Sequence, residues 1–191
     1  MTAHGSLLRA IDREEMVEWY RRTRERTRGL FEIPVAGAWY DRPIALRNPI
    51  VFYEGHLPAF AINTLVKLAQ GGKGIDSHFE SLFERGIDPE DETSVRDPAE
   101  MWPSRAEVRA YGAEADRLVE RALRDIEESD AVQVEAGSTI IEHELMHQET
   151  LLYMFQNLSY YRKNRPPEAG LRTSAVESRG PVSIQVPACA A

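Results

Sequence analysis

Apolar side chains recur every three or four residues along much of the chain, which is the spacing of one face of an α-helix. We therefore expect four long helices, over about residues 6–29, 48–70, 103–126 and 132–162. Segments with the alternating pattern of a β-strand are almost absent. This pattern predicts an all-α protein, a four-helix bundle whose metal or ligand sites form between facing helices.

Helix-terminating and capping residues support these limits. Ser104 and Glu107 fit a capping box at the start of the third helix. Asn48 and Pro49 fit an N-cap followed by proline at the first helical position of the second helix. That second helix is apolar nearly all round, so we expect it to be central.

Length and composition bound the fold and its partners. The 191 residues, 42% hydrophobic and 28% charged, are typical of a globular domain. We expect one domain over residues 1–165, then a non-helical tail over 166–191, rich in Gly, Ser and Pro, that is a linker or the start of a second domain. The only cysteine, Cys189, excludes an internal disulfide.

Charge and hydropathy argue against two classes of protein, those that bind nucleic acid and those that span a membrane. A net charge of −8 argues against nucleic acid as the main partner. The sequence has no membrane-length apolar run and no signal peptide, so we expect a cytoplasmic protein. Residues 76–100 carry nine acidic side chains against two arginines, and we interpret them as a solvated loop with one short helix at 76–84.

The main chemical feature is a pair of histidines one helical turn apart, His143 and His147. They share a face with an apolar stripe, which should turn both imidazoles toward the core. The stripe comprises Ile140, Leu151, Met154 and Leu158. Two imidazoles so placed can bind one cation if a third ligand meets them.

The segment from His143 to His147 also matches the zinc-protease pattern, in which Glu144 would activate water. The available third ligand would be Glu168, which follows two prolines, and we find no strands that would form a substrate cleft. A di-iron site needs two Glu-x-x-His sequences, and the chain has one. We therefore rank both alternatives below a three-histidine site.

His56, near the start of the central helix, is the better third ligand. Three neutral imidazole nitrogens can occupy one face of an octahedral ion, which favours Fe(II) over closed tetrahedral zinc. Glu149 is a candidate to hold an imidazole N–H from outside the ligand set. His4 and His78 receive no role. We interpret the aromatic residues of this region as core and loop packing: Trp39, Tyr40, Phe52, Tyr53, Phe60 and Trp102.

Three separated motifs, at residues 46–56, 81–89 and 143–149, occur in an order that resembles the DinB-like domain of the iron-dependent sulfoxide synthases of ergothioneine and ovothiol biosynthesis. The resemblance implies a DinB-like four-helix bundle over residues 1–165. It also implies Fe(II) on His56, His143 and His147. The implied reaction is O₂-dependent C–S bond formation between a histidine derivative and a cysteine-containing thiol.

Those enzymes continue into a second domain that contributes most of the histidine-substrate pocket. We therefore expect the full activity to need such a domain after residue 165. Two other functions stay open. One is a stand-alone DinB-like metal-dependent thiol transferase. The other is a non-enzymatic metal-bound protein that binds a partner through residues 76–100.

Overall fold

The computed structural model describes residues 12–84 and 102–164, and within these ranges the protein is helical. The helices are α1 (Arg13–Leu30), η1 (Ala36–Ala38), α2 (Ile50–Ala61), η2 (Ile62–Ala69), α3 (Ser77–Phe83), α4 (Arg105–Arg124), α5 (Ala131–Gln156) and η5 (Tyr160–Arg162). The described residues contain no strand, only an isolated bridge between Pro34 and Lys163. The all-α prediction is confirmed. None of these helices is long and apolar enough to cross a bilayer.

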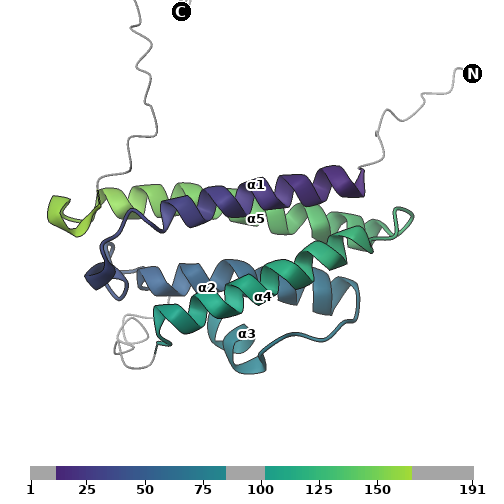
Figure 1. Cartoon of the computed structure of the whole chain (residues 1–191), viewed down its shortest axis with the longest axis horizontal. Helices are drawn as coiled ribbons and strands as arrows, with labels where there is room; N and C mark the ends of the chain where they lie inside the picture. Colours follow the sequence, from purple (N-terminus) through teal and green to yellow (C-terminus); the bar gives the residue numbers. More distant parts are fainter. Residues whose placement is uncertain (1–11, 85–101, 165–191) are drawn as a thin grey trace, which may run out of the picture.

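Figure 1 shows α1 beside α5 and α2 beside α4, with the short α3 on the outer side of α2. Contacts between the helix ends show how α4 runs relative to α1 and α2. Arg105, at the start of α4, donates to the carbonyl of Phe31 at 3.0 Å and to Glu54 at 3.1 Å. At the other end, Arg13 donates to the carbonyl of Ile126 at 3.3 Å. Helix α4 is therefore antiparallel to α1 and parallel to α2.

Two apolar clusters fill the bundle, and a layer of buried polar side chains lies between them. One cluster gathers residues from Phe31, the start of α2 and the end of α5, and the other gathers Met16, Val17 and the end of α4. We call the buried polar residues between them the polar layer: Thr23, Arg24, Thr27, His56, Asp116, Glu144, His147 and Gln148. Buried polar groups are costly unless they are paired, so this layer is where function is expected.

Some predicted helix limits were wrong. Helix α2 begins at Ile50, with Pro49 at the N-cap and no side-chain cap, because the preceding loop supplies the acceptors. The carbonyls of Asp41 and Trp39 accept from the first two helical N–H groups. Helix α5 ends at Gln156, where the Asn157 amide donates to a carbonyl of the last turn. The start predicted at residue 6 lies outside the described residues, and Arg13 is the first helical residue described.

Other predictions about the ends were right. The capping box at Ser104 and Glu107 is present. In contrast, the interpretation of residues 76–100 as a solvated loop is wrong for Glu80, which is buried and accepts from the Ile75 backbone at 2.6 Å and from Lys67 at 3.1 Å. Residues 85–100 and the tail at 166–191 lie outside the described part.

Helix α2 passes directly into the π-helix η2, which the periodicity did not predict. Pro58, inside α2, has no N–H to donate to the preceding turn. Helix η2 ends at Ala69, and two residues later Gly71 has a φ of 65°, the left-handed conformation that glycine adopts most easily. π-Helical turns are often found at functional sites, and this one follows His56 on the same continuous helix.

Gly55 allows α3 to approach α2 closely. A methyl group at this position would overlap the ring of Phe83, the last residue of α3. The next residue after Gly55 is His56, and its ring contacts the Phe83 carbonyl. The absence of a side chain at Gly55 therefore sets where that carbonyl lies.

Gly55→Ala is expected to destabilise the fold by about 1–3 kcal/mol, the usual cost of overpacking a buried position. Gly29→Ala is the matched control, since nothing lies within 4 Å of the added methyl group in α1. It should be neutral or stabilise by up to about 1 kcal/mol. Urea unfolding measures both changes, and equal effects of the two substitutions would contradict the packing described for Gly55.

Candidate metal centre

The structure brings together the three histidines singled out in the sequence. His56 comes from α2, and His143 and His147 come from α5. The Nε2 atom of His143 lies 3.2 Å from Nε2 of His56 and 3.1 Å from Nε2 of His147. Within the described residues, these three form a group whose candidate ligand atoms all lie within 4.8 Å of one another. The group can bind a metal ion.

The protein fixes the tautomer of His56. Its Nδ1 lies 2.7 Å from the carbonyl oxygen of Phe83, and a carbonyl only accepts. The proton is therefore on Nδ1, and Nε2 presents its lone pair to the other two rings. A backbone carbonyl on the outer nitrogen is a common way to orient a metal-binding imidazole.

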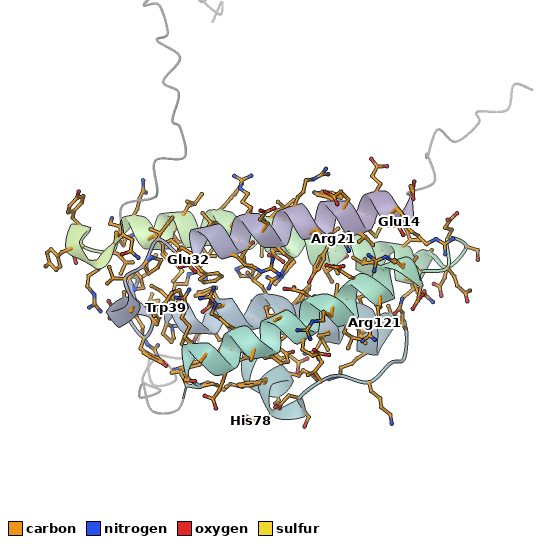
Figure 2. All side chains as sticks on the ribbon, in the orientation of Figure 1. Glu14, Arg21, Glu32, Trp39, His78 and Arg121 are labelled. Atoms are coloured by element: carbon orange, nitrogen blue, oxygen red, sulfur yellow. The ribbon has the colours of Figure 1, made fainter. Side chains whose placement is uncertain are left out.

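The outer nitrogens of the other two histidines have no such partner. Nδ1 of His143 and Nδ1 of His147 are buried without a hydrogen bond. Glu149 is exposed, and the contact expected from it to an imidazole is not present. Of the histidines without an assigned role, His4 lies outside the described residues. His78 is exposed on α3, away from the bundle interior (Figure 2).

Aromatic rings pack against the imidazoles and restrict their orientation. Phe60 stacks on His143 with ring centroids 3.6 Å apart, and Phe52 stacks on His56 at 5.1 Å. These residues were interpreted as general core packing. Phe52 and Phe60 lie four residues before and after His56, so all three share one face of the helix. This spacing could have related the two rings to the site.

Burial keeps the histidines neutral. It lowers the pKa of His143 to about 3, with a further contribution from His147 and His56. Burial also lowers the pKa of His147 to about 3, with His56 and Arg47 adding to the effect. The pKa of His56 is lowered by burial as well, and its bond to the Phe83 carbonyl opposes the shift. At neutral pH the three rings are unprotonated, as metal binding requires.

The distances between nitrogens fit a shared cation. With metal–nitrogen bonds of about 2.1 Å, two ligands are about 3.0 Å apart at an octahedral ion and about 3.4 Å apart at a tetrahedral one. The observed 3.1 and 3.2 Å fall between these values. In a metal complex each Nε2 would turn its lone pair to the cation, whose charge offsets the repulsion between the lone pairs. The residues present therefore fit a metal without selecting iron over zinc.

Glu144 points toward Arg24 of α1 and not into the group of three histidines. Its carboxylate accepts from Nη1 of Arg24 at 2.9 Å, and Nε of Arg24 donates to Asp116 at 2.7 Å. Burial raises the pKa of Glu144, and Arg24 opposes the shift. A carboxylate held by Arg24 in this way is not available to activate a metal-bound water. The zinc-protease interpretation loses its general base, and its third ligand, Glu168, lies outside the described residues.

Sequence reasoning missed this ion-pair network. Asp116 also accepts from the Tyr20 hydroxyl at 2.8 Å and from Arg28 at 2.5 Å. The sequence of α1 did indicate such a network, because Arg24 lies on the buried face of the helix with Tyr20 and Thr27. An arginine on the apolar face of a helix predicts a buried acidic partner.

A cavity of about 480 Å³ adjoins His56 and extends along η2. It is lined by His56, Phe60, Asn63, Thr64, Lys67, Leu68 and Glu84. Amide, hydroxyl and ammonium groups beside an apolar ring suit a small polar ligand. The site therefore has a space next to His56 in which a substrate can lie.

Two known proteins named for ergothioneine biosynthesis are similar to this chain. Ergothioneine biosynthesis protein 1 of Neurospora crassa is 35% identical over 60% of the chain, and the protein of the same name from Schizosaccharomyces pombe is 31% identical over 61%. The aligned part spans only 14% and 16% of the length of these two relatives.

The family model described as the DinB superfamily matches residues 20–156. The match begins within α1 and ends at the last residue of α5, so it includes most of α1, the other three long helices and all three histidines. The chain belongs to the DinB superfamily.

Proposed function

We propose that this chain is the Fe(II)-binding domain of an O₂-dependent sulfoxide synthase that joins a cysteine-containing thiol to a histidine derivative. The convergence of three Nε2 atoms at 3.1 and 3.2 Å is the observation that carries the proposal. Two relatives named for ergothioneine biosynthesis support the substrate class.

In this proposal His56, His143 and His147 bind the metal and leave its other positions to substrates. Bound Fe(II) would supply the O₂ and redox chemistry. The Phe83 carbonyl holds His56 in the required tautomer, and Phe60 covers one face of His143. Buried, neutral imidazoles do not compete for protons near pH 7.

The overall reaction balances with O₂ as the oxidant. One S–H bond of the thiol and one C–H bond of the histidine derivative break, and one C–S bond forms. One oxygen atom becomes the sulfoxide oxygen and the other leaves as water. The cavity beside His56 is of a size for small polar substrates of this kind.

Metal should stabilise the fold, because it binds the assembled triad and not the unfolded chain. At a free metal concentration 100 times Kd, the gain is about 2.7 kcal/mol. Calorimetry of the metal-free chain with added Fe(II), under anaerobic conditions, should show a melting temperature several degrees higher. His56→Ala and His143→Ala should remove most of this shift, whereas His78→Ala should keep it.

Co(II) provides a second readout that separates geometries, since octahedral Co(II) absorbs weakly in the visible range and tetrahedral Co(II) absorbs strongly. We expect weak absorption, as for three histidines and added water. Strong absorption would favour a closed zinc-type site. An equal melting shift in the His78→Ala and His143→Ala variants would contradict the triad.

The metal-free chain should lose stability as pH falls from about 6.5 toward 3. In this window the unfolded histidines take up protons and the buried His143 and His147 do not, so the unfolded state binds more protons and acid favours it. The slope is at most about 1.4 kcal/mol per pH unit for each histidine. Denaturant unfolding at several pH values should show a flatter profile for the variant His143→Leu/His147→Leu. An unchanged profile would mean that the buried pair does not titrate as described.

A thiol substrate should bind at the metal. Adding cysteine to the Co(II)-loaded chain should produce a new near-ultraviolet absorption band, and His147→Ala should abolish it. Serine is the matched control, since it replaces the sulfur with oxygen and should produce no such band. Turnover of the thiol in the absence of O₂ would instead support the thiol-transferase alternative.

A further inference from the structure

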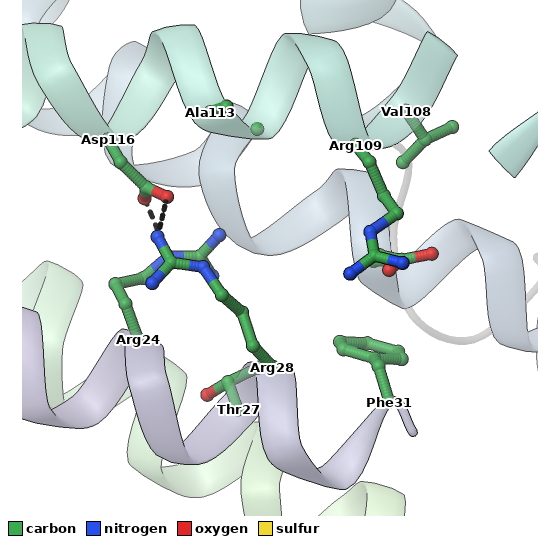
Figure 3. Close-up of a pocket in the computed structure, with 10 residues that line it drawn as sticks. Arg24, Thr27, Arg28, Phe31, Val108, Arg109, Ala113 and Asp116 are labelled. Atoms are coloured by element: carbon green, nitrogen blue, oxygen red, sulfur yellow. Dashed lines mark hydrogen bonds and ion pairs between the residues drawn. The ribbon is translucent and has the colours of Figure 1, made fainter. Parts of the chain in front are cut away.

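A second pocket lies between α1 and α4 and includes none of the three histidines (Figure 3). Its volume is about 220 Å³. It is lined by Arg24, Thr27, Arg28, Phe31, Glu54, Val108, Arg109, Gly112, Ala113 and Asp116. Three of these residues are arginines, in a chain whose net charge is −8.

The buried side of this pocket presents a guanidinium nitrogen without a protein partner. Arg24 is only 6% exposed. Its Nε donates to Asp116 and its Nη1 donates to Glu144, but within the described residues no hydrogen bond is made by its Nη2. Nη2 would lie 3.9 Å from a Cβ added at Gly112, so it faces the pocket beside that glycine. Unused N–H donors on a buried cation attract an acceptor.

Two more arginines lie at the mouth of the pocket. Arg28 and Arg109 are about half exposed, and each uses Nη2 for one acidic partner, Asp116 and Glu32 respectively. Figure 3 shows the Arg109 guanidinium facing the ring of Phe31, with Arg24 and Arg28 directed at Asp116 from α1. The remaining guanidinium nitrogens of Arg28 and Arg109 are available to a ligand between them.

The charges around the pocket cancel, so simple attraction of any anion is not the argument. Four arginines (24, 28, 105 and 109) stand against four carboxylates (Glu32, Glu54, Asp116 and Glu144). The carboxylates of Asp116 and Glu54 line the pocket and already accept from arginines. Within the described residues, Nη2 of Arg24 and the remaining nitrogens of Arg28 and Arg109 have no acceptor. A planar carboxylate matches such forks in two-point hydrogen bonds.

We propose that this pocket binds a small carboxylate, held by Arg24 Nη2 on its buried side and by Arg28 and Arg109 at its mouth. The site is separate from the metal centre and does not depend on the proposed synthase activity. Arg24 connects the two, because the same guanidinium holds Glu144 on the helix that carries His143.

The test is calorimetric titration of the metal-free chain with malonate at low salt, so that the ligand does not bind a metal. Saturable binding is expected. Arg109→Gln should weaken it about tenfold, as loss of one charge-assisted contact does. Arg117→Gln, on the exposed side of α4 and outside the pocket lining, is the control and should leave the affinity unchanged.

A second pair of variants keeps the fold intact. A methyl group at Gly112 meets only ordinary contacts, at 3.8 Å from Pro58 and 3.9 Å from Arg24. Gly112→Ala should therefore fold at least as stably as the wild type yet bind malonate more weakly. Gly29→Ala makes the same exchange in open space and should bind normally.

Three results would overturn the proposal. The first is no saturable malonate binding by the folded wild type. The second is binding that Arg109→Gln and Gly112→Ala do not change. The third is inorganic phosphate binding more than tenfold tighter than malonate, which would replace the carboxylate with a different class of anion.

Discussion

The buried ion pair between Arg24 of α1 and Glu144 of α5 is the interaction on which the rest of the site depends. It joins α5 to α1 at the residue next to His143, and together with the apolar contacts of α5 it sets which way His143 and His147 point. With Glu144 turned to Arg24, the two imidazoles face α2 and meet His56. Breaking a buried pair by removing one partner leaves an uncompensated charge, which typically costs about 3–5 kcal/mol. The position of the three histidines is thus coupled to the stability of the bundle.

The second constraint comes from the close packing of α3 on α2. Gly55 lets the ring of Phe83 lie against the helix, and the carbonyl of Phe83 then accepts the Nδ1 proton of His56. His143 and His147 have no corresponding partner on Nδ1, so packing orients them instead, with Phe60 stacked on His143. One ligand is held by a hydrogen bond, and the pair on α5 is held by the helix and by ring stacking.

The hydrophobic pattern was enough to predict the four long helices, because α2 is buried nearly all round and the other three bury apolar side chains at helical spacing. Spacing was also enough to select His143 and His147, and the resemblance of the surrounding motifs supported His56. Two features were not predictable in this way. The cap at Pro49 depends on the carbonyls of Trp39 and Asp41, in the loop after η1. The π-helix η2 ends in backbone hydrogen bonds from residues 70–72 to the carbonyls of Leu65, Val66 and Lys67. The pairing of Glu144 with Arg24 was not predictable for a similar reason, since the two residues are 120 positions apart.

The central claim is that one metal ion binds to Nε2 of His56, His143 and His147. The most direct measurement is a crystal structure of the Fe(II)-loaded chain with anomalous diffraction at the iron edge. The account predicts one anomalous peak about 2.1 Å from each of the three Nε2 atoms. A peak at other residues, or histidines that stay at their present separations with no metal between them at saturating iron, would contradict it.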